Sequence, residues 1–305
     1  MKRTLIITFA LLTMLTSQAA TRRALVIGIG DYPASSGWAK INGDKDIPMV
    51  EEMLTTNGFD KQNIVKLRNE QATCSAICRE MEHLISQSQA GDFVYIHFSG
   101  HGQQITDLNG DETDGKDEAW IPYDAHFAFE SGVYEGEHHL VDDQLNAYLH
   151  HLRQSVGAGG KIIVVADACH SGDGTRGDDE EEEKECIRGT DSIFTISNIK
   201  QTVKRFTSIF SKGKSDKISD SHISAPQPTP LEWIYISACK DYQCNSEFKG
   251  MGSLTTALSR VQNQLSTLTI PSLSKKLKSF YTDNIARSQT PAIETPTGAE
   301  SDIFF

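Results

Sequence analysis

The chain has 305 residues, of which 38% are apolar and 23% charged, so it is long enough to bury a hydrophobic core without disulfide staples. This composition excludes wholesale disorder, a collagen-like fibre and a small disulfide-rich protein. The formal net charge of −12 argues against nucleic acid as a partner, because phosphate binding needs a positive surface. A cation or a basic peptide fits the charge better.

The first twenty residues have the pattern of a secretory signal peptide. Lys2 and Arg3 precede the apolar run 5–15, and residues 17–20 include small side chains suited to cleavage. The run is too short to span a bilayer. We therefore expect residues 1–20 to be removed, leaving a periplasmic or secreted protein with no integral membrane span. The alternative is an N-terminal anchor or a buried strand.

Short apolar runs alternate with stretches of helical periodicity along the mature chain. Continuous apolar runs are typical of strands that are covered on both faces. The alternation predicts an α/β domain with a mainly parallel sheet. The expected strands are residues 23–30, 92–100, 161–168 and 232–238, and the expected helices are residues 46–57, 73–87 and 143–152.

The composition changes after Gly172. Residues 178–185 hold seven acids and one lysine, and polar residues dominate from there to Pro230. Such a segment buries too little apolar surface to offset its ordering entropy. We expect residues 173–230 to form a flexible, solvated insertion between the two parts of one domain, residues 21–172 and 231–305. The insertion also carries basic residues: Arg176, Lys184, Arg188, Lys200, Lys204, Arg205 and Lys212.

Two of the expected strands end in a potentially catalytic residue beside glycine. One runs into Ser99-Gly-His-Gly102 and the other into Asp167-Ala-Cys-His-Ser-Gly172. In open α/β sheets the reactive site lies beyond the carboxyl ends of the strands. If these two strands are neighbours, His101 and Cys169 face each other there.

That pair has the chemistry of a cysteine hydrolase. His101 would take the proton of the Cys169 thiol and later protonate a leaving amine. The backbone amides of Gly102 and Cys169 would stabilise an oxyanion. No residue that orients the imidazole is identifiable from the sequence.

Other histidines and cysteines have structural explanations. His97 lies inside an apolar strand and is expected to be a core residue with satisfied hydrogen bonds. Cys74 and Cys78 fall one helical turn apart and are expected to be half-buried. Cys239 and Cys244 are candidates for a disulfide in an exported protein.

The two strand-end motifs resemble those of the metacaspases, which are caspase-related cysteine peptidases. The acidic stretch 107–118 followed by Trp-Ile-Pro-Tyr-Asp124 also resembles that family, as do residues 236–243 and 252–258. The similarity spans most of residues 23–258. It implies a caspase-like three-layer α/β sandwich and a His101–Cys169 dyad.

The resemblance also implies cleavage after arginine or lysine. The family's substrate-binding positions match Asp46, Ser99 and Asp167, with Asp44 as a rival to Asp46 because the local motif departs from the family pattern. Independently of the resemblance, a basic side chain requires a buried carboxylate as its partner. The predicted partners are therefore proteins or peptides with a basic residue before the cut. The protein itself is expected to be a monomer.

Calcium and self-processing are further implications of the resemblance. The family's calcium ligands match Asp117, Asp142 and Asp143, although Arg176 stands near the place of a later aspartate. The alternative for this stretch is an ordinary solvated acidic loop. Many relatives cut themselves after a basic residue in the interval that residues 173–230 occupy here. The chemistry itself requires no cofactor.

Two other functions fit the same residues. One is a clostripain- or gingipain-like peptidase of the same clan, with similar specificity but different processing. The other is a catalytically silent caspase-like scaffold that binds partners or calcium.

Overall fold

A computed structural model describes most of the chain. The described residues are 20–107, 110, 112, 114–169, 187–196, 231–240, 243–285 and 289–305. All but the last residue of the expected signal peptide lies outside them, as does most of the expected insertion.

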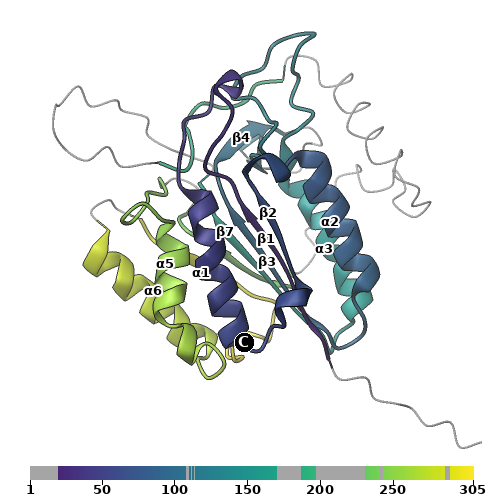
Figure 1. Ribbon diagram of the computed structural model, residues 1–305, viewed down its shortest axis with the longest axis vertical. Helices are drawn as coiled ribbons and strands as arrows, with labels where there is room; N and C mark the ends of the chain where they lie inside the picture. The colour runs from purple at the N-terminus through teal and green to yellow at the C-terminus, as the bar shows by residue number, and fades with distance from the viewer. Residues whose placement is uncertain are drawn as a thin grey trace, which may run out of the picture.

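A six-stranded sheet forms the centre of the molecule, in the order β2-β1-β3-β7-β8-β9 (Figure 1). Each neighbouring pair is parallel except β8 and β9. All four expected strands are present, whereas β2 and β9 were not predicted, because short edge strands lack a continuous apolar run. The strands are β1 Arg22–Gly28, β2 Ile64–Arg68, β3 Phe93–Ser99, β7 Lys161–Asp167, β8 Ile234–Ser237 and β9 Ala292–Glu294.

Helices cover both faces of this sheet, which confirms the expected three-layer α/β sandwich. Figure 1 shows α1 Gly43–Thr56, α5 Ser253–Arg260 and α6 Ile270–Asn284 on one side. The other side carries α2 Cys74–Gln87 and α3 Asp142–Val156. The helices α5 and α6 were not predicted. Short 3-10 turns lie at Ala34–Ser36, Lys61–Asn63, Asn69–Gln71 and Gln262–Gln264.

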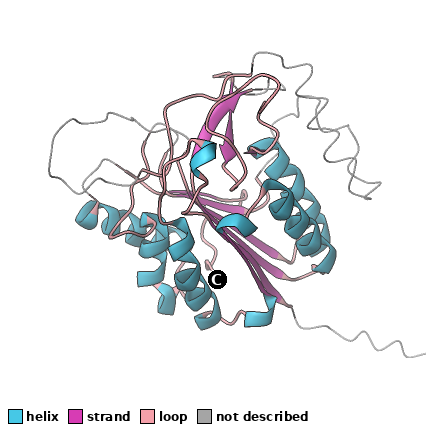
Figure 2. Cartoon of the chain, turned by 45° about the horizontal axis from the view of Figure 1, so that its top comes forward, coloured by secondary structure: helices cyan, strands magenta, loops and turns pink. Residues whose placement is uncertain are grey.

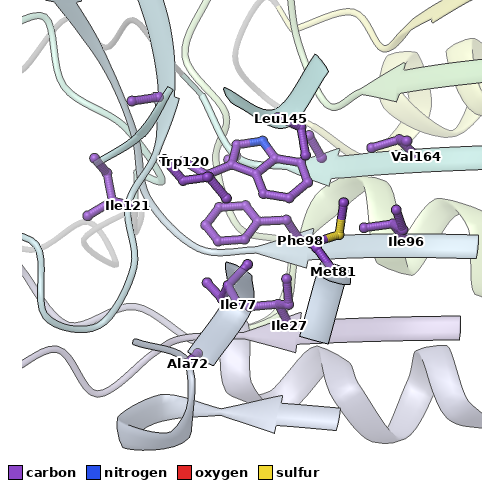
Figure 3. Close-up of a cluster of buried hydrophobic side chains, with 14 of the residues drawn as sticks. Ile27, Ala72, Ile77, Met81, Ile96, Phe98, Trp120, Ile121, Leu145 and Val164 are labelled. Carbon is purple, nitrogen blue, oxygen red and sulfur yellow. The ribbon is translucent and has the colours of Figure 1, made fainter. Parts of the chain in front are cut away.

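Each side of the sheet has its own hydrophobic core. On the α2 and α3 side, the ring of Phe98 stacks on that of Trp120 with centroids 4.6 Å apart, and Ile77 and Met81 of α2 lie in the same cluster (Figure 3). On the other side, Leu254 and Leu273 are fully buried. Burial on both faces explains why β1, β3 and β7 are apolar along their length.

A second, antiparallel sheet of three strands lies beyond one end of the large sheet (Figure 2). It consists of β4 Gly102–Thr106, β5 Lys116–Trp120 and β6 Leu140–Val141. The acidic stretch after His101 therefore forms the β4–β5 connection and the first part of β5. Over the described ranges, no helix has the length and apolar character needed to cross a bilayer.

Candidate active site

The two predicted catalytic motifs meet at one edge of the large sheet. Strands β3 and β7 are parallel neighbours, and Ser99 at the end of β3 pairs in register with Asp167 at the end of β7. His101 and Cys169 each follow two residues later. The prediction that these two strands are neighbours is confirmed, and both motifs leave the sheet side by side.

The imidazole of His101 is held by groups that the sequence did not identify. Its Nε2 hydrogen-bonds to the backbone carbonyl oxygen of Ala39 at 2.9 Å, and the Trp38 ring stacks on it with centroids 4.7 Å apart. The backbone N–H of His101 donates to the Tyr32 hydroxyl at 3.0 Å. A carbonyl can orient an imidazole from any residue type, so Ala39 left no signal in the sequence.

The other ring nitrogen of His101 is free to exchange a proton. Nδ1 is buried and has no hydrogen-bond partner among the described residues. Burial, which is the largest effect, and the charge of nearby Arg188 lower the pKa of His101 to about 4 against the opposing effect of the Ala39 hydrogen bond. At neutral pH the imidazole is therefore neutral. With Nε2–H donated to Ala39, Nδ1 carries the lone pair of a general base.

The Cys169 side chain is almost fully buried. Its thiol hydrogen-bonds to the Gln243 carbonyl oxygen. A hydrogen bond with Cys169, together with burial, raises the pKa of the Cys239 thiol well above its usual value. None of the described cysteines, Cys244 included, forms a disulfide. The candidate disulfide between Cys239 and Cys244 is therefore wrong: Cys239 lies against Cys169 instead.

The predicted oxyanion donors converge on a carbonyl oxygen of the chain itself. The Arg188 oxygen accepts hydrogen bonds from the backbone N–H of Cys169 at 2.9 Å and of Gly102 at 3.2 Å. Two backbone N–H groups aimed at one carbonyl form the arrangement that stabilises a tetrahedral oxyanion.

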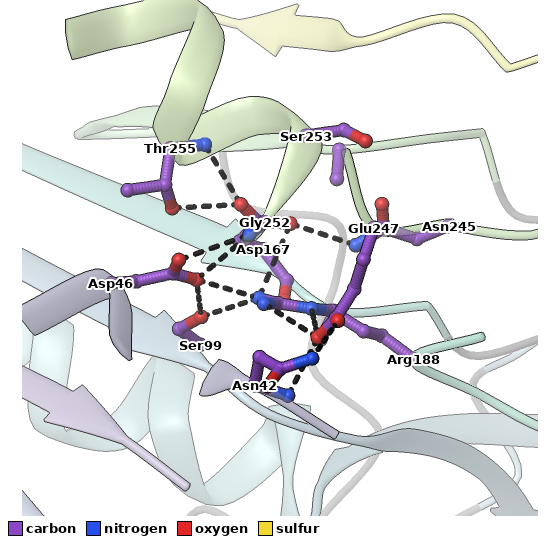
Figure 4. Close-up of polar contacts among 12 residues, drawn as sticks. Asn42, Asp46, Ser99, Asp167, Arg188, Asn245, Glu247, Gly252, Ser253 and Thr255 are labelled. Carbon is purple, nitrogen blue, oxygen red and sulfur yellow. Dashed lines mark hydrogen bonds and ion pairs between the residues drawn. The ribbon is translucent and has the colours of Figure 1, made fainter. Parts of the chain in front are cut away.

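The side chain of the same arginine fills the predicted acidic pocket (Figure 4). Arg188 is completely buried, and its Nη1 donates to Asp46 Oδ2 at 2.8 Å and to the Ser99 hydroxyl. The backbone carbonyl of Asp167 accepts from the same nitrogen at 3.3 Å. The structure thus brings Asp46, Ser99 and Asp167 together around one guanidinium.

The carboxylate of Asp167 contacts this guanidinium less directly than expected. Its Oδ1 lies 3.7 Å from Arg188 Nη1. The carboxylate instead accepts hydrogen bonds from the backbone N–H and hydroxyl of Thr255, both at 2.7 Å, and from Asn245 Nδ2 at 2.8 Å. Asp167 therefore anchors the C-terminal part of the domain. Its negative charge acts on the Arg188 guanidinium without a direct hydrogen bond to the carboxylate.

The rival carboxylate, Asp44, has a different partner. Its Oδ2 accepts from Arg68 Nη2 at 2.6 Å, and among the described residues this carboxylate forms no hydrogen bond or ion pair with Arg188. Of the two alternatives that the sequence left open, Asp46 is the one in the pocket.

Glu247 completes the pocket, and sequence reasoning missed it. Its Oε1 accepts from Arg188 Nη2 at 3.0 Å and from Nε at 3.2 Å. Glu247 lies between residues 236–243 and 252–258, the two stretches that carried the resemblance, so no motif marked it. The hairpin that holds it had no strand periodicity to reveal it.

The pocket balances buried charge with buried charge. Burial raises the pKa of Asp46 to about 6, while Arg188 opposes that rise. Burial alone would lower the pKa of Arg188, but Asp46, Asp167 and Glu247 together raise it above its ordinary value. A cation is therefore required here, because removing it would leave several buried carboxylates uncompensated.

The backbone around Arg188 pairs with the C-terminal part of the domain. Its N–H donates to the Asn245 carbonyl at 2.9 Å, and Ile187 forms an antiparallel bridge with Ser246. Further along, Phe194 is buried and exchanges backbone hydrogen bonds with β4.

Residues 187–196 therefore differ from the solvated linker expected for residues 173–230. The reason is local. Arg188 neutralises buried carboxylates, and Phe194 and Ile196 are buried, whereas the composition of the whole insertion is dominated by polar residues. The other basic residues named in the insertion lie outside the described residues.

The predicted metal ligands lie together near the start of α3. Asp117 is buried on β5, and Asp142 and Asp143 form the first turn of α3. Burial and the charges of Asp143, Asp117 and Glu118 raise the pKa of Asp142 well above its usual range, and its Oδ1 has no hydrogen-bond partner in the described chain. No described group of three or more such side chains is closed around a metal position.

Comparison with known proteins identifies the class of protein to which this fold and site belong. The family model of the caspase domain matches residues 21–299. The chain therefore belongs to the caspase-domain family.

The curated relatives that it matches include several metacaspases. The chain is 33% identical to Metacaspase-1 of Eremothecium gossypii over half of its own length, which is 32% of that protein. It is 25% identical to Metacaspase-1 of Mycosarcoma maydis over 95% of this chain and 74% of that protein. It spans 56% of Metacaspase-1 of Candida albicans, at 28% identity over 78% of this chain.

A solved structure shares the fold. Protein GSU0716 from Geobacter sulfurreducens superposes with a TM-score of 0.61, with 92% of this chain and 96% of that chain covered at 23% identity. This similarity supports the fold of the whole domain.

Proposed function

We propose that this protein is a cysteine endopeptidase that cleaves after a basic residue, with Cys169 as the nucleophile and His101 as the general acid and base. One observation carries the proposal: Arg188 contacts the predicted oxyanion donors and the predicted acidic pocket as a substrate would. Its carbonyl oxygen accepts from the amides of Gly102 and Cys169, while its guanidinium contacts Asp46 and Ser99.

The chemistry follows from these contacts. The Cys169 sulfur attacks the carbonyl carbon as the thiol proton moves to His101 Nδ1. The carbonyl oxygen becomes an oxyanion that the two backbone N–H groups stabilise. When the carbon–nitrogen bond breaks, His101 returns its proton to the leaving amine, which leaves a thioester on Cys169. Water then hydrolyses the thioester, with its proton passing through His101, and the thiol is restored.

The first substrate is the chain itself, cut between Arg188 and Gly189. A Cβ atom on Gly189 would lie 2.3 Å from the Cys169 carbonyl oxygen and 2.9 Å from the Cys169 Cβ, so this glycine packs directly against the nucleophile's residue. In the uncut chain Arg188 occupies the acidic pocket and contacts the oxyanion donors. Cleavage and release of this segment would then open that site to other substrates, as in a zymogen.

The self-cut is tested by mass spectrometry of the intact chain over time. Wild type is expected to give two fragments that meet between residues 188 and 189, whereas Cys169→Ala stays whole. Arg188→Gln is expected to remove that cut, and Arg205→Gln, elsewhere in the insertion, is expected to retain it. A cut that persists in Cys169→Ala would contradict the mechanism.

Hydrolysis of fluorogenic peptides separates this proposal from its rivals. A peptidase of this kind cleaves peptides with arginine or lysine before the cut and not those with aspartate. A silent scaffold cleaves none of them. A clostripain- or gingipain-like enzyme would cleave the basic peptides without the cut at residue 188.

Calcium stimulation is part of the proposal. Asp117, Asp142 and Asp143 would hold the ion, since carboxylate oxygens are the ligands that calcium prefers. The unpartnered Oδ1 of Asp142 among like charges supports a cation there. Bound calcium would neutralise the mutual repulsion of these carboxylates and brace α3.

Export is likewise proposed from the basic and apolar residues of positions 1–20, and the exported protein is proposed to be a monomer. N-terminal mass analysis of protein recovered from the periplasm or medium tests signal removal, and light scattering tests the monomer. A mature N-terminus near residue 21 is expected.

A further inference from the structure

Glu247 binds the part of the Arg188 guanidinium that no lysine could offer. We propose that Glu247 makes this pocket select arginine over lysine; the inference rests on the proposed function. Nε and Nη2 of Arg188 both donate to Glu247 Oε1, at 3.2 and 3.0 Å.

The guanidinium is held on two sides by different residues (Figure 4). Asp46 and Ser99 bind Nη1, and Glu247 binds the Nε and Nη2 side. A lysine carries one ammonium group and no Nε–H in the middle of its side chain. Its ammonium could be paired with Asp46, but the two hydrogen bonds to Glu247 would be lost.

The Glu247 carboxylate is fixed and cannot follow a smaller cation. Its Oε1 also accepts from the Asn42 backbone N–H at 2.6 Å, and its Oε2 accepts from Asn42 Nδ2. Its side chain is 3% exposed. A tight hairpin holds its backbone: Glu247 bridges to Gly252, and Phe248 and Met251 exchange backbone hydrogen bonds.

The same hairpin connects Glu247 to the opposite wall of the pocket. The Gly252 N–H donates to Asp46 Oδ1 at 2.9 Å. The carboxylates that bind the two sides of the guanidinium are therefore set at a fixed separation by one element. A lysine would leave the buried Glu247 carboxylate without its cation partner. An unpaired buried charge costs more binding free energy than the loss of a hydrogen bond that water can replace.

The test is a comparison of two peptides that differ only in arginine or lysine before the cut, with kcat/KM measured on the self-processed enzyme. Wild type is expected to prefer arginine by about 10-fold or more, the range for hydrogen bonds to a charged group. Glu247→Gln is expected to lower arginine cleavage by about 10- to 100-fold and lysine cleavage by a smaller factor. The arginine-to-lysine ratio then falls at least about fivefold.

The chain's own cut provides a second measurement. Arg188→Lys is expected to slow self-cleavage in the wild-type background and to slow it much less when Glu247→Gln is already present, so the two changes are coupled. Glu70→Gln, an exposed glutamate on the surface, serves as the matched control and is expected to leave the ratio unchanged.

Each outcome has one reading. If Glu247→Gln lowers both peptides equally, or if wild type does not prefer arginine, the role of Glu247 is wrong while the peptidase stands. If wild type cleaves neither basic peptide and does not cut itself, the proposed function fails and takes this inference with it. Lysine cleavage by Glu247→Gln shows that the variant is folded.

Discussion

The carbonyl oxygen of Arg188 accepts a hydrogen bond from the backbone N–H of Cys169, nineteen positions earlier in the chain, at 2.9 Å. The two residues belong to different parts of the domain: Cys169 follows the end of the buried strand β7, and Arg188 follows the acidic run. Their contact joins the candidate nucleophile to a bond that it could cut. Several measurable consequences depend on this contact and on the groups around it.

Asp46→Asn should reduce cleavage after arginine by about 100-fold or more, because the neutral amide cannot compensate a fully buried guanidinium. The measurement is kcat/KM on an arginine peptide. Asp44→Asn is the matched control, since that carboxylate pairs with Arg68 and is expected to change the value by less than about twofold. Equal losses in both variants would mean that the pocket has been assigned to the wrong carboxylate.

Tyr32→Phe should lower both stability and kcat. The Tyr32 hydroxyl accepts from the His101 N–H and donates to the Ile121 carbonyl at 2.8 Å, so its loss leaves buried groups unpaired at about 1–3 kcal/mol. Denaturant unfolding of the Cys169→Ala form measures the first effect and peptide hydrolysis the second.

Tyr134→Phe separates these two effects. It removes a buried hydroxyl that hydrogen-bonds to His139 rather than to His101. We expect it to lower stability while retaining kcat. A similar loss of kcat in both variants would argue that Tyr32 acts through general stability and not through His101.

His97 should make folding stability depend on pH. As predicted, it is a core histidine, hydrogen-bonded to Tyr95 and Thr255. Burial lowers its pKa to about 4, below the unfolded value of 6.5, while Asp167 raises it and Arg188 lowers it. Between pH 4 and 6.5 the unfolded chain therefore binds a proton at His97 that the folded chain does not bind. The contribution of His97 to the free energy of unfolding is present above pH 6.5 and is lost as the pH falls toward 4.

The comparison of Cys169→Ala with the same protein carrying His97→Gln isolates that histidine. The free energy of unfolding should fall less steeply with decreasing pH in the glutamine variant, by up to about 1.4 kcal/mol per pH unit in that window. Parallel curves for the two proteins would show that His97 titrates normally in the folded state.

Asp142→Asn should stabilise the calcium-free protein at neutral pH. Burial and neighbouring carboxylates raise the pKa of Asp142, so its ionised form is costly and the amide removes that cost. Calcium should raise the melting temperature of the Cys169→Ala protein and have a much smaller effect after Asp142→Asn.

Asp114→Asn, at an exposed acid of the same acidic stretch, is the control for non-specific charge effects. It should leave the calcium response intact. If calcium shifts the melting temperature equally in all three proteins, the carboxylates at the start of α3 do not hold the ion.

The sequence alone determined which residues could carry the chemistry. Three apolar runs long enough to be covered on both faces predicted β1, β3 and β7. The glycine-flanked His101 followed the end of one of them, and Cys169 followed the end of another. Because neighbouring parallel strands end at one edge, these local signals were enough to predict that the two motifs leave the sheet at the same edge. Local periodicity likewise located α1, α2 and α3.

Only the tertiary structure decided which groups complete the site. Arg188 was one of many basic residues in a polar segment, and nothing in its neighbours along the chain distinguished it. Ala39 contributes a carbonyl that every residue has, and Glu247 reaches the pocket through a hairpin held by Asn42, 205 positions away. Such contacts join residues that are distant in sequence and depend on burial and charge balance, which periodicity and motifs along a chain do not encode.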